Sequence, residues 1–307
     1  MWATSYHIVY KSGENLEDSV KAELMAVDNS LSAFNPASLL SAINSNATDS
    51  TDSMFAEIFL ASQEVSRRSH GAFDPTVGPL SDLWGFGKFE IEALPDSATL
   101  SKTLKLIGIN DCHISSDGRI IKKDPATEFD FSAIAKGYGA DRVARMLERN
   151  GVEDYMVEIG GEIVLRGYNP KGKPWRIQID APVDVDSTSE LHTRLTIMEF
   201  GPSPVAMATS GNYRNYCKDT EGNKYGHTLD PRTGMPVQTA LLSATVTAPT
   251  CLQADAIATA CMVLEPDSAY RFLLDYGSPV EAMLVMADTT ISANKYMIKT
   301  TPGFNPQ

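Results

Sequence analysis

The stretch DYMVEIGGEIVLRG (154–167) decides the fold class. Its β-branched and apolar residues fall into two short runs that are separated by Gly160-Gly161. Glycine accepts the positive φ angles of a tight turn, so the stretch predicts two strands that meet there. Two more strand-like segments, WRIQID and RLTIMEF, follow without a helical segment between them. Because the chain lacks a regular alternation of strand and helix, we predict an α+β fold with mixed or antiparallel sheets packed by helices.

Further elements follow from local patterns on both sides of this stretch. SYHIVY reads as an opening strand, and the next segment places Leu16, Val20 and Leu24 on one stripe of a helix. MFAEIFLASQEVSRRSH predicts a second helix, with a preceding Thr or Asp as its N-cap. We expect GAFDPTVGPLSDLWGFG to form a loop, because it is dense in Gly, Pro and aromatic residues. EFDF predicts a strand that leads into a helix ending at Gly151.

Composition limits the classes of function. The chain has 307 residues, of which 43% are hydrophobic, enough for a large folded core. A net charge of -13 argues against nucleic-acid binding, which needs clustered Lys and Arg. No apolar run approaches the roughly 18 residues that a membrane-spanning helix needs. The four cysteines have no CxxC spacing, and we expect them to be mostly free, buried thiols.

CLQADAIATACMVL (251–264) predicts a buried helix with two polar positions, Asp255 and Thr259. Side chains four residues apart share one face of a helix. A carboxylate and a hydroxyl are the hard oxygen ligands that Mg²⁺ prefers. The alternative is a structural pair in which Thr259 bonds its own helix backbone and Asp255 meets an arginine. Spacing alone leaves both interpretations open.

DFSAIAKGYGAD (130–141) places an acid, Asp130, before a glycine-rich helix start that carries Lys136. Free N–H groups and the helix dipole favour an anion at such a point. The stretch matches neither a Walker A loop nor GxGxxG, so an ordinary helix entry is the alternative to phosphate binding.

His227 lies in the polar loop GHTLDPRTGMPV and is one of only five histidines. It can act as a base, a ligand or a hydrogen-bond donor, or serve as an ordinary surface residue. In GAFDP, Phe73 and Asp74 pair a ring with a carboxylate, although Phe73 can equally anchor the loop in the core. Phe34 and Trp84 present the same choice.

These segments together resemble the ApbE family of FAD:protein FMN transferases. The resemblance covers nearly the whole chain and rests on segments that occur in the family's order: LSAFNPASLLSAIN, HGAFDPTVGPLSDLWGFG, DFSAIAKGYGADRVARML, EIGGEIVLRG, ATSGNY, HTLDPRTGMPV and SATVTAPTCLQADAIATACMVL. It implies a single T-fold-like α+β domain over residues 1–307, with two subdomains flanking an FAD cleft as an option.

The resemblance also implies roles for individual residues. Asp255, Thr259 and the main-chain carbonyl of Ala133 match the family's magnesium ligands. The remaining matches concern the flavin nucleotide and comprise Trp2, Phe34, Ala72, Phe73, Asp74, Asp130, Lys136 and His227. Phe34 stands where many members carry a stacking Tyr, and Trp2 where a Met often touches the cofactor.

The implied reaction is Mg²⁺-dependent transfer of FMN from FAD to a Thr or Ser hydroxyl of an acceptor flavoprotein, with release of AMP. His227 is the expected catalytic group that orients or deprotonates the hydroxyl. FAD hydrolysis to FMN and AMP, or FAD storage, are the alternatives. The resemblance further implies a periplasmic protein or a lipoprotein anchored to the inner membrane. No leader-like segment begins the printed sequence, so a cytoplasmic location is the alternative.

Overall fold

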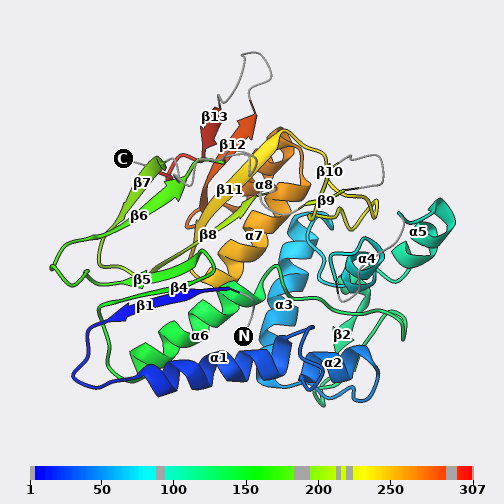
Figure 1. Cartoon of the computed structure of the whole chain (residues 1–307), viewed down its shortest axis with the longest axis horizontal. Coiled ribbons are helices and arrows are strands. Elements are labelled where there is room, and N and C mark those ends of the chain that lie inside the picture. The colour runs from blue at the N-terminus through cyan, green and yellow to red at the C-terminus, as the bar shows by residue number, and fades with distance from the viewer. Residues whose placement is uncertain are drawn as a thin grey trace. The chain divides into compact units, whose positions relative to one another are not determined.

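The computed structural model describes residues 4–87, 94–182, 194–211, 216–218, 224–287 and 296–305 (Figure 1). The chain divides into two compact units. The first comprises residues 1–2, 25–135 and 215–238, and the second comprises residues 3–24, 136–214 and 239–307. The positions of the two units relative to each other are not determined.

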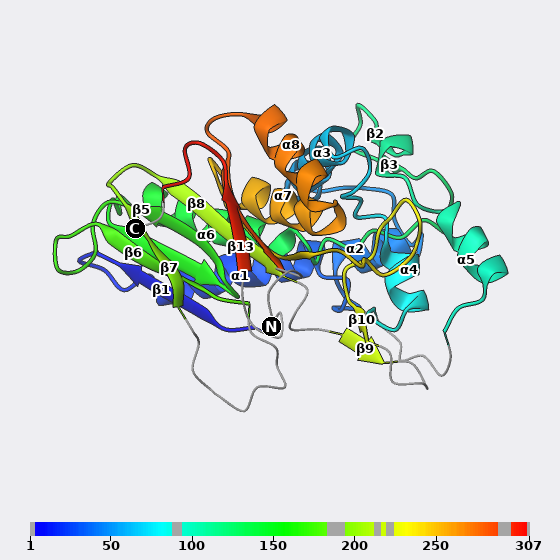
Figure 2. The same cartoon turned by 90° about the horizontal axis from the view of Figure 1, so that it is seen from above.

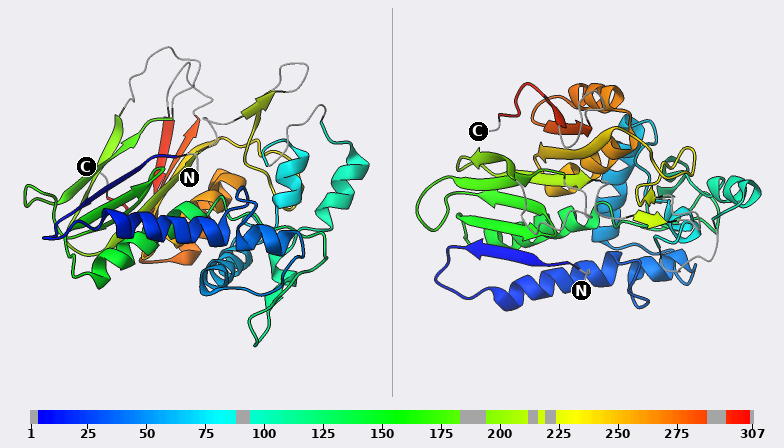
Figure 3. Two further views of the ribbon diagram at one scale, coloured as in Figure 1. Left: turned by 60° about the horizontal axis from the view of Figure 1, so that its bottom comes forward. Right: turned by 45° about the horizontal axis from the view of Figure 1, so that its top comes forward.

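The second unit is built on a seven-stranded antiparallel sheet in the order β1-β4-β5-β8-β11-β12-β13. Figure 3 shows β1 and β13 at its opposite edges. The strands are β1 (Tyr6–Tyr10), β4 (Tyr155–Ile159), β5 (Glu162–Arg166), β8 (Val205–Gly211), β11 (Leu241–Ala248), β12 (Glu281–Ala287) and β13 (Tyr296–Thr300). The predicted turn at Gly160-Gly161 joins β4 to β5, and both glycines have positive φ, 62° and 102°.

A two-stranded hairpin, β6 (Trp175–Asp180) and β7 (Arg194–Phe200), packs against one face of the sheet. The alternation in WRIQID explains this contact, since every second side chain of a strand points to the same side. Trp175, Ile177 and Ile179 are buried together with Met283 and Val285 of β12. The predicted strands WRIQID and RLTIMEF are therefore confirmed, and their apolar sides complete a core.

Helices α6 (Ala135–Arg149), α7 (Cys251–Val263) and α8 (Pro266–Tyr276) complete this unit. Helix α7 packs on β8 and β11, and α8 lies beside it (Figures 1 and 2). Helix α7 is buried nearly all round, which its small apolar residues allow. Its Thr250 N-cap accepts the backbone N–H of Gln253 at 3.3 Å. The helix predicted from CLQADAIATACMVL is thus confirmed.

The first unit is mainly helical. It contains α2 (Leu39–Asn44), α3 (Ser53–Arg68), α4 (Gly78–Leu83), α5 (Ser97–Leu104), the 3₁₀ helix η1 (Ile109–Asp111), β2 (His113–Ile114), β3 (Ile120–Ile121), β9 (Tyr216–Lys218) and β10 (Lys224–Gly226). Its core holds the rings of Phe55, Phe59, Phe129 and Phe131, and the centroids of neighbouring rings lie 5.5 to 6.1 Å apart. Helix α1 (Glu17–Leu31) contributes residues to both units.

Two local predictions are wrong. EFDF does not form a regular strand, because the side-chain amide of Asn44 takes both backbone bonds of Phe129: Nδ2 donates to its carbonyl and Oδ1 accepts its N–H, each at 2.8 Å. The GAFDPTVGPLSDLWGFG segment is not all loop, because it contains α4. Pro79 stands in the first turn of that helix, where its missing N–H costs nothing.

The other predicted elements agree with the structure. Asp52 is the N-cap of α3 and accepts the N–H of Phe55 at 2.7 Å. Cys112, Cys251 and Cys261 are free and buried, whereas the side chain of Cys217 lies outside the described residues. In the described part of the chain, no helix is long and apolar enough to cross a membrane.

Candidate functional site

Helices α6 and α7 approach each other closely at Gly137, in the first turn of α6. A Cβ built on Gly137 would lie 2.3 Å from the carbonyl oxygen of Cys251 and 2.9 Å from Cβ of Asp255. Any larger residue would push the two helices apart. The glycine-rich start of this helix therefore serves close packing against α7, which brings the backbone of α6 up to the Asp255 side chain.

Each of these two helices caps the other. The Gly137 N–H donates to Oδ2 of Asp255 at 3.0 Å. In return, the Asp141 carboxylate accepts the N–H groups of Cys251 and Leu252, at 2.9 Å each. The first N–H groups of a helix have no partner within it, and the helix dipole favours negative charge there. Two buried carboxylates thus accept N–H groups at both helix starts and fix the position of α7.

Lys136 forms an ion pair with Glu162, the first residue of β5. Its Nζ lies 2.6 Å from Oε1 of Glu162, whose side chain is only 3% exposed, against 32% for the lysine. The lysine stem passes over the hairpin turn, since a Cβ on Gly160 would stand 3.2 Å from its Cδ. The turn that decides the fold class therefore also makes room for this side chain.

The cluster formed by Lys136, Glu162 and Asp255 contains two acidic groups and one basic group. Burial raises the pKa of Asp255, against the opposing effects of the Lys136 charge and the Gly137 N–H. Burial and then the charge of Asp255 raise the pKa of Glu162 to about 8, although Lys136 opposes this. Burial disfavours the charge on Lys136, but Asp255 and Glu162 outweigh it and raise its pKa. Two buried carboxyl groups share one ammonium, an arrangement that further positive charge would stabilise.

Thr259 lies one turn after Asp255 on α7. Its hydroxyl is 3.3 Å from that of Ser210 on β8. Within the described ranges, no group of three or more His, Cys, Asp or Glu side chains is arranged to hold a metal ion. A metal at Asp255 would therefore depend on hydroxyl and carbonyl oxygens, which suits Mg²⁺, an ion that commonly uses one or two protein carboxylates. The donor set fits the ion that the resemblance implies.

In the first unit, Asp74 holds its own loop together. Its carboxylate accepts the N–H and the hydroxyl of Thr76, at 2.9 and 2.6 Å, and the N–H of Ile109 at 2.9 Å. Burial raises its pKa against these hydrogen bonds. Ala72 and Phe73 are buried beside it, so Phe73 does anchor the loop in the core. A nucleotide contact of this segment stays a prediction.

The first unit also brings three of the resemblance segments together. The Asp130 N–H donates to the carbonyl of Pro75 at 2.6 Å, which joins DFSA to AFDP. The indole N–H of Trp84 donates to the carbonyl of Gly234 at 2.7 Å, which joins the aromatic segment to HTLDPRTG. His227 is half-buried near the start of that last segment.

The other predicted residues lie as follows. Phe34 is 62% exposed, so its ring is open to a stacking partner. The Asp130 carboxylate accepts the N–H and the hydroxyl of Ser132. Ala133 stands two residues before α6 in the chain. Trp2 lies outside the described residues.

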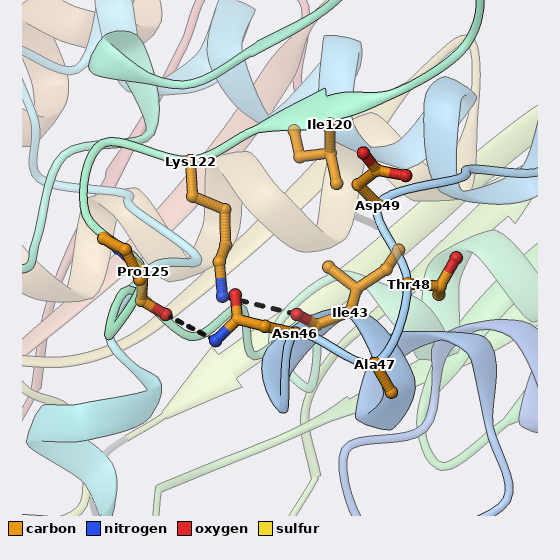
Figure 4. A pocket seen from close by; sticks show the side chains of 8 residues that line it. All are labelled: Ile43, Asn46, Ala47, Thr48, Asp49, Ile120, Lys122 and Pro125. Atoms are coloured by element: carbon orange, nitrogen blue, oxygen red, sulfur yellow. Dashed lines mark hydrogen bonds between the residues drawn. The ribbon is translucent and has the colours of Figure 1, made fainter.

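A hollow of about 380 Å³ opens in the first unit (Figure 4). None of the predicted site residues lines it. The ammonium of Lys122 donates to the carbonyls of Ile43 and Asn44 at 3.3 and 3.4 Å, at the end of α2. Asn46 donates through Nδ2 to the carbonyl of Pro125 at 3.0 Å. These donors already form hydrogen bonds within the walls of the hollow. Their positions are therefore explained without a bound ligand.

Comparison with known proteins agrees with this architecture. The sequence model of the ApbE family matches residues 2–284. FAD:protein FMN transferase of Vibrio cholerae is 37% identical over 273 residues, which cover 85% of this chain and 78% of the relative. The protein of the same name from Haemophilus influenzae is 35% identical over 281 residues, covering 87% of this chain and 79% of the relative.

Solved structures give the same result. The flavin transferase ApbE from Vibrio cholerae matches with a TM-score of 0.83 at 30% identity, covering 98% of this chain and 94% of that one. The apo form of the flavinyl transferase ApbE from Pseudomonas stutzeri matches with a TM-score of 0.82 at 33% identity, covering 97% and 91%. The fold and these relatives together define an α+β enzyme of the transferase class. The chain belongs to the ApbE family, as its sequence motifs predicted.

Sequence reasoning missed three residues of the second unit: Gly137 as the contact point, Asp141 as the cap of α7, and Glu162 as the partner of Lys136. Asp141 carried a signal, because it falls among the inward positions of its helix, where a carboxylate needs a partner. Nothing in the sequence indicated that Glu162 is buried, since the first residue of a strand after a turn is commonly polar. Only the folded chain brings it to the lysine.

Proposed function

We propose that this protein transfers FMN from FAD to a Thr or Ser hydroxyl of an acceptor flavoprotein and releases AMP. The observation that carries the proposal is the start of α6, where the Lys136 ammonium is held by Glu162 and the Gly137 N–H contacts the buried Asp255 of α7. Such a helix start favours a phosphate. Membership of the ApbE family supports the choice of FAD as the nucleotide.

The reaction breaks the bond between the two phosphates of FAD. The acceptor oxygen attacks the FMN phosphorus, a new P–O bond forms, and AMP leaves with the bridging oxygen. In such a transfer, a protein mainly positions the groups and neutralises growing charge. Lys136 at the start of α6 would bind the phosphate oxygens, and His227 would orient the acceptor hydroxyl and take its proton.

Asp255, Thr259 and the carbonyl of Ala133 are the proposed magnesium ligands. When bound, Mg²⁺ would polarise the phosphate oxygens as a Lewis acid. Phe34 would stack on the flavin, and Ala72, Phe73, Asp74, Asp130 and Trp2 would contact the nucleotide. We further propose that the whole chain works as one functional domain and acts in the periplasm, as the family resemblance implies.

The test incubates the purified protein with FAD, Mg²⁺ and a candidate acceptor protein and follows in-gel flavin fluorescence. A fluorescent acceptor band together with released AMP supports the proposal. Free FMN and AMP without a labelled acceptor would replace it with FAD hydrolysis. Bound but unchanged FAD would replace it with storage.

Two substitutions at Asp255 distinguish its charge from its hydrogen bond to the Gly137 N–H. Asp255→Asn keeps an oxygen for the Gly137 N–H but loses the charge, whereas Asp255→Ala loses both. We expect both variants to lose transfer by at least about 100-fold, because a Lewis acid contributes several kcal/mol to such a barrier. The control Asp267→Ala removes an acid that is 86% exposed and should transfer FMN at the wild-type rate. His227→Ala should retain FAD and transfer slowly.

A further inference from the structure

Glu162 has a buried carboxylate with only one of its two oxygens in use. Oε1 contacts the Lys136 ammonium at 2.6 Å, while Oε2 is buried and has no hydrogen-bond partner within the described part of the chain. A buried charged group that is incompletely paired destabilises a fold. Replacing a buried ion pair with apolar residues is often neutral or stabilising. Stability of the sheet is therefore a poor explanation for an acid at this position.

The ion pair instead controls where the lysine lies. A lysine side chain is flexible, and its ammonium has no preferred direction of its own. Here the stem is confined by Gly160, whose missing Cβ leaves room for Cδ, and the tip is held by Glu162. The ammonium is kept in the first turn of α6, and 32% of the lysine side chain is accessible.

We propose that Glu162 is a positioning residue that acts through Lys136. It holds the ammonium at the helix start, beside the buried Asp255, in the place where the lysine binds a nucleotide phosphate. Glu162 itself does not touch the phosphate, because its side chain is buried and Oε1 already contacts the Lys136 ammonium. This role rests on the proposed function for its ligand, FAD, but is tested by binding as well as by transfer.

Loss of the Glu162 contact with Lys136 has a specific consequence. Asp255 is then the remaining carboxylate that acts on Lys136, because both acids raise the pKa of the lysine in the intact cluster. We expect the ammonium to move toward Asp255 and to compete there with a cation. Glu162→Gln should therefore weaken FAD binding and also raise the Mg²⁺ concentration at which transfer is half-maximal.

The experiment is a double-mutant cycle with Glu162→Gln, Lys136→Met and the double variant in the full chain. Quenching of FAD fluorescence gives the Kd, and flavin labelling of the acceptor gives the rate. Glu162→Gln should lower affinity and rate by about 10- to 100-fold, the range for misplaced supporting groups. The double variant should match Lys136→Met alone, because Glu162 has no effect once the lysine is absent.

The matched control is Glu158→Gln at the same hairpin. Glu158 accepts the Gly161 N–H at 2.6 Å and His7 at 2.7 Å, but does not hold Lys136. The Glu158→Gln variant should leave FAD affinity unchanged. Glu162→Asp keeps the charge and shortens the side chain, so it should give an intermediate loss and stands in if Glu162→Gln does not fold.

Three results would overturn the proposal: wild-type affinity in a folded Glu162 variant, additive effects in the cycle, or equal losses in Glu158→Gln. If the wild-type protein binds FAD without transferring FMN, the proposed function fails. A non-additive cycle in FAD affinity would then still support the positioning role.

Discussion

Replacing Gly137 with alanine tests the contact between α6 and α7 directly. The added Cβ would lie 2.3 Å from the Cys251 carbonyl oxygen. Carbon and oxygen atoms in such contacts normally stay about 3.3 Å apart or more, so the helices must separate by about 1 Å. The hydrogen bond of 3.0 Å between the Gly137 N–H and Asp255 would then break.

The expected cost follows from three effects. Overpacking costs about 1–3 kcal/mol, and the lost bond to a charged acceptor about 1.5–3 kcal/mol. Alanine recovers about 1 kcal/mol because it favours the helix over glycine. We therefore expect Gly137→Ala to lower the free energy of unfolding by about 1.5–5 kcal/mol.

Urea unfolding followed by circular dichroism measures this change, and FAD-dependent labelling of an acceptor measures the site. Gly201→Ala is the control, because nothing lies within 4 Å of a Cβ built there. It should change stability by less than about 0.5 kcal/mol. If Gly137→Ala were as stable as this control and still transferred FMN normally, the close contact of α6 and α7 would be refuted.

Three further substitutions test the supporting contacts. Asp141→Ala removes the cap from two N–H groups of α7 and should cost about 2–4 kcal/mol in urea unfolding; an unchanged midpoint would contradict the cap. Asp74→Ala leaves the Ile109 N–H without its acceptor and should cost about 1–3 kcal/mol, whether or not FAD is present. Trp84→Phe loses the bond to the Gly234 carbonyl and should lower the thermal midpoint, and a wild-type midpoint would show that the bond contributes nothing.

The elements that sequence predicted well are those with strong local signals. The Gly160-Gly161 turn and the alternation in WRIQID each identified strands, because both patterns follow from backbone geometry within a few residues. The failures arose where a distant residue decided the outcome. The amide of Asn44 takes the backbone bonds of Phe129, and it lies 85 residues away in the chain. No pattern within EFDF could have indicated this.

The candidate site shows the same division. Asp255 and Lys136 drew attention because a charge on an apolar helix and a glycine-rich helix start are both unusual. Their partners depend on tertiary structure: Gly137 contacts Asp255 from 118 residues away. Glu162 carries the least local signal, since its burial depends on the packing of β5 in the sheet. Local pattern singled out Asp255 and Lys136 as candidates, whereas the groups that contact them, Gly137 and Glu162, could be found only from the fold.

The mutual capping of α6 and α7 has a consequence for biosynthesis. The two helices are joined by hydrogen bonds that span 110 to 118 residues, and contacts between distant residues form late in folding. A nascent chain that has not reached Asp255 has a bare start on α6 and an acid at Asp141 without its partners. The paired helix starts are therefore complete only after the ribosome has released α7, so this part of the second unit forms only in a nearly complete polypeptide.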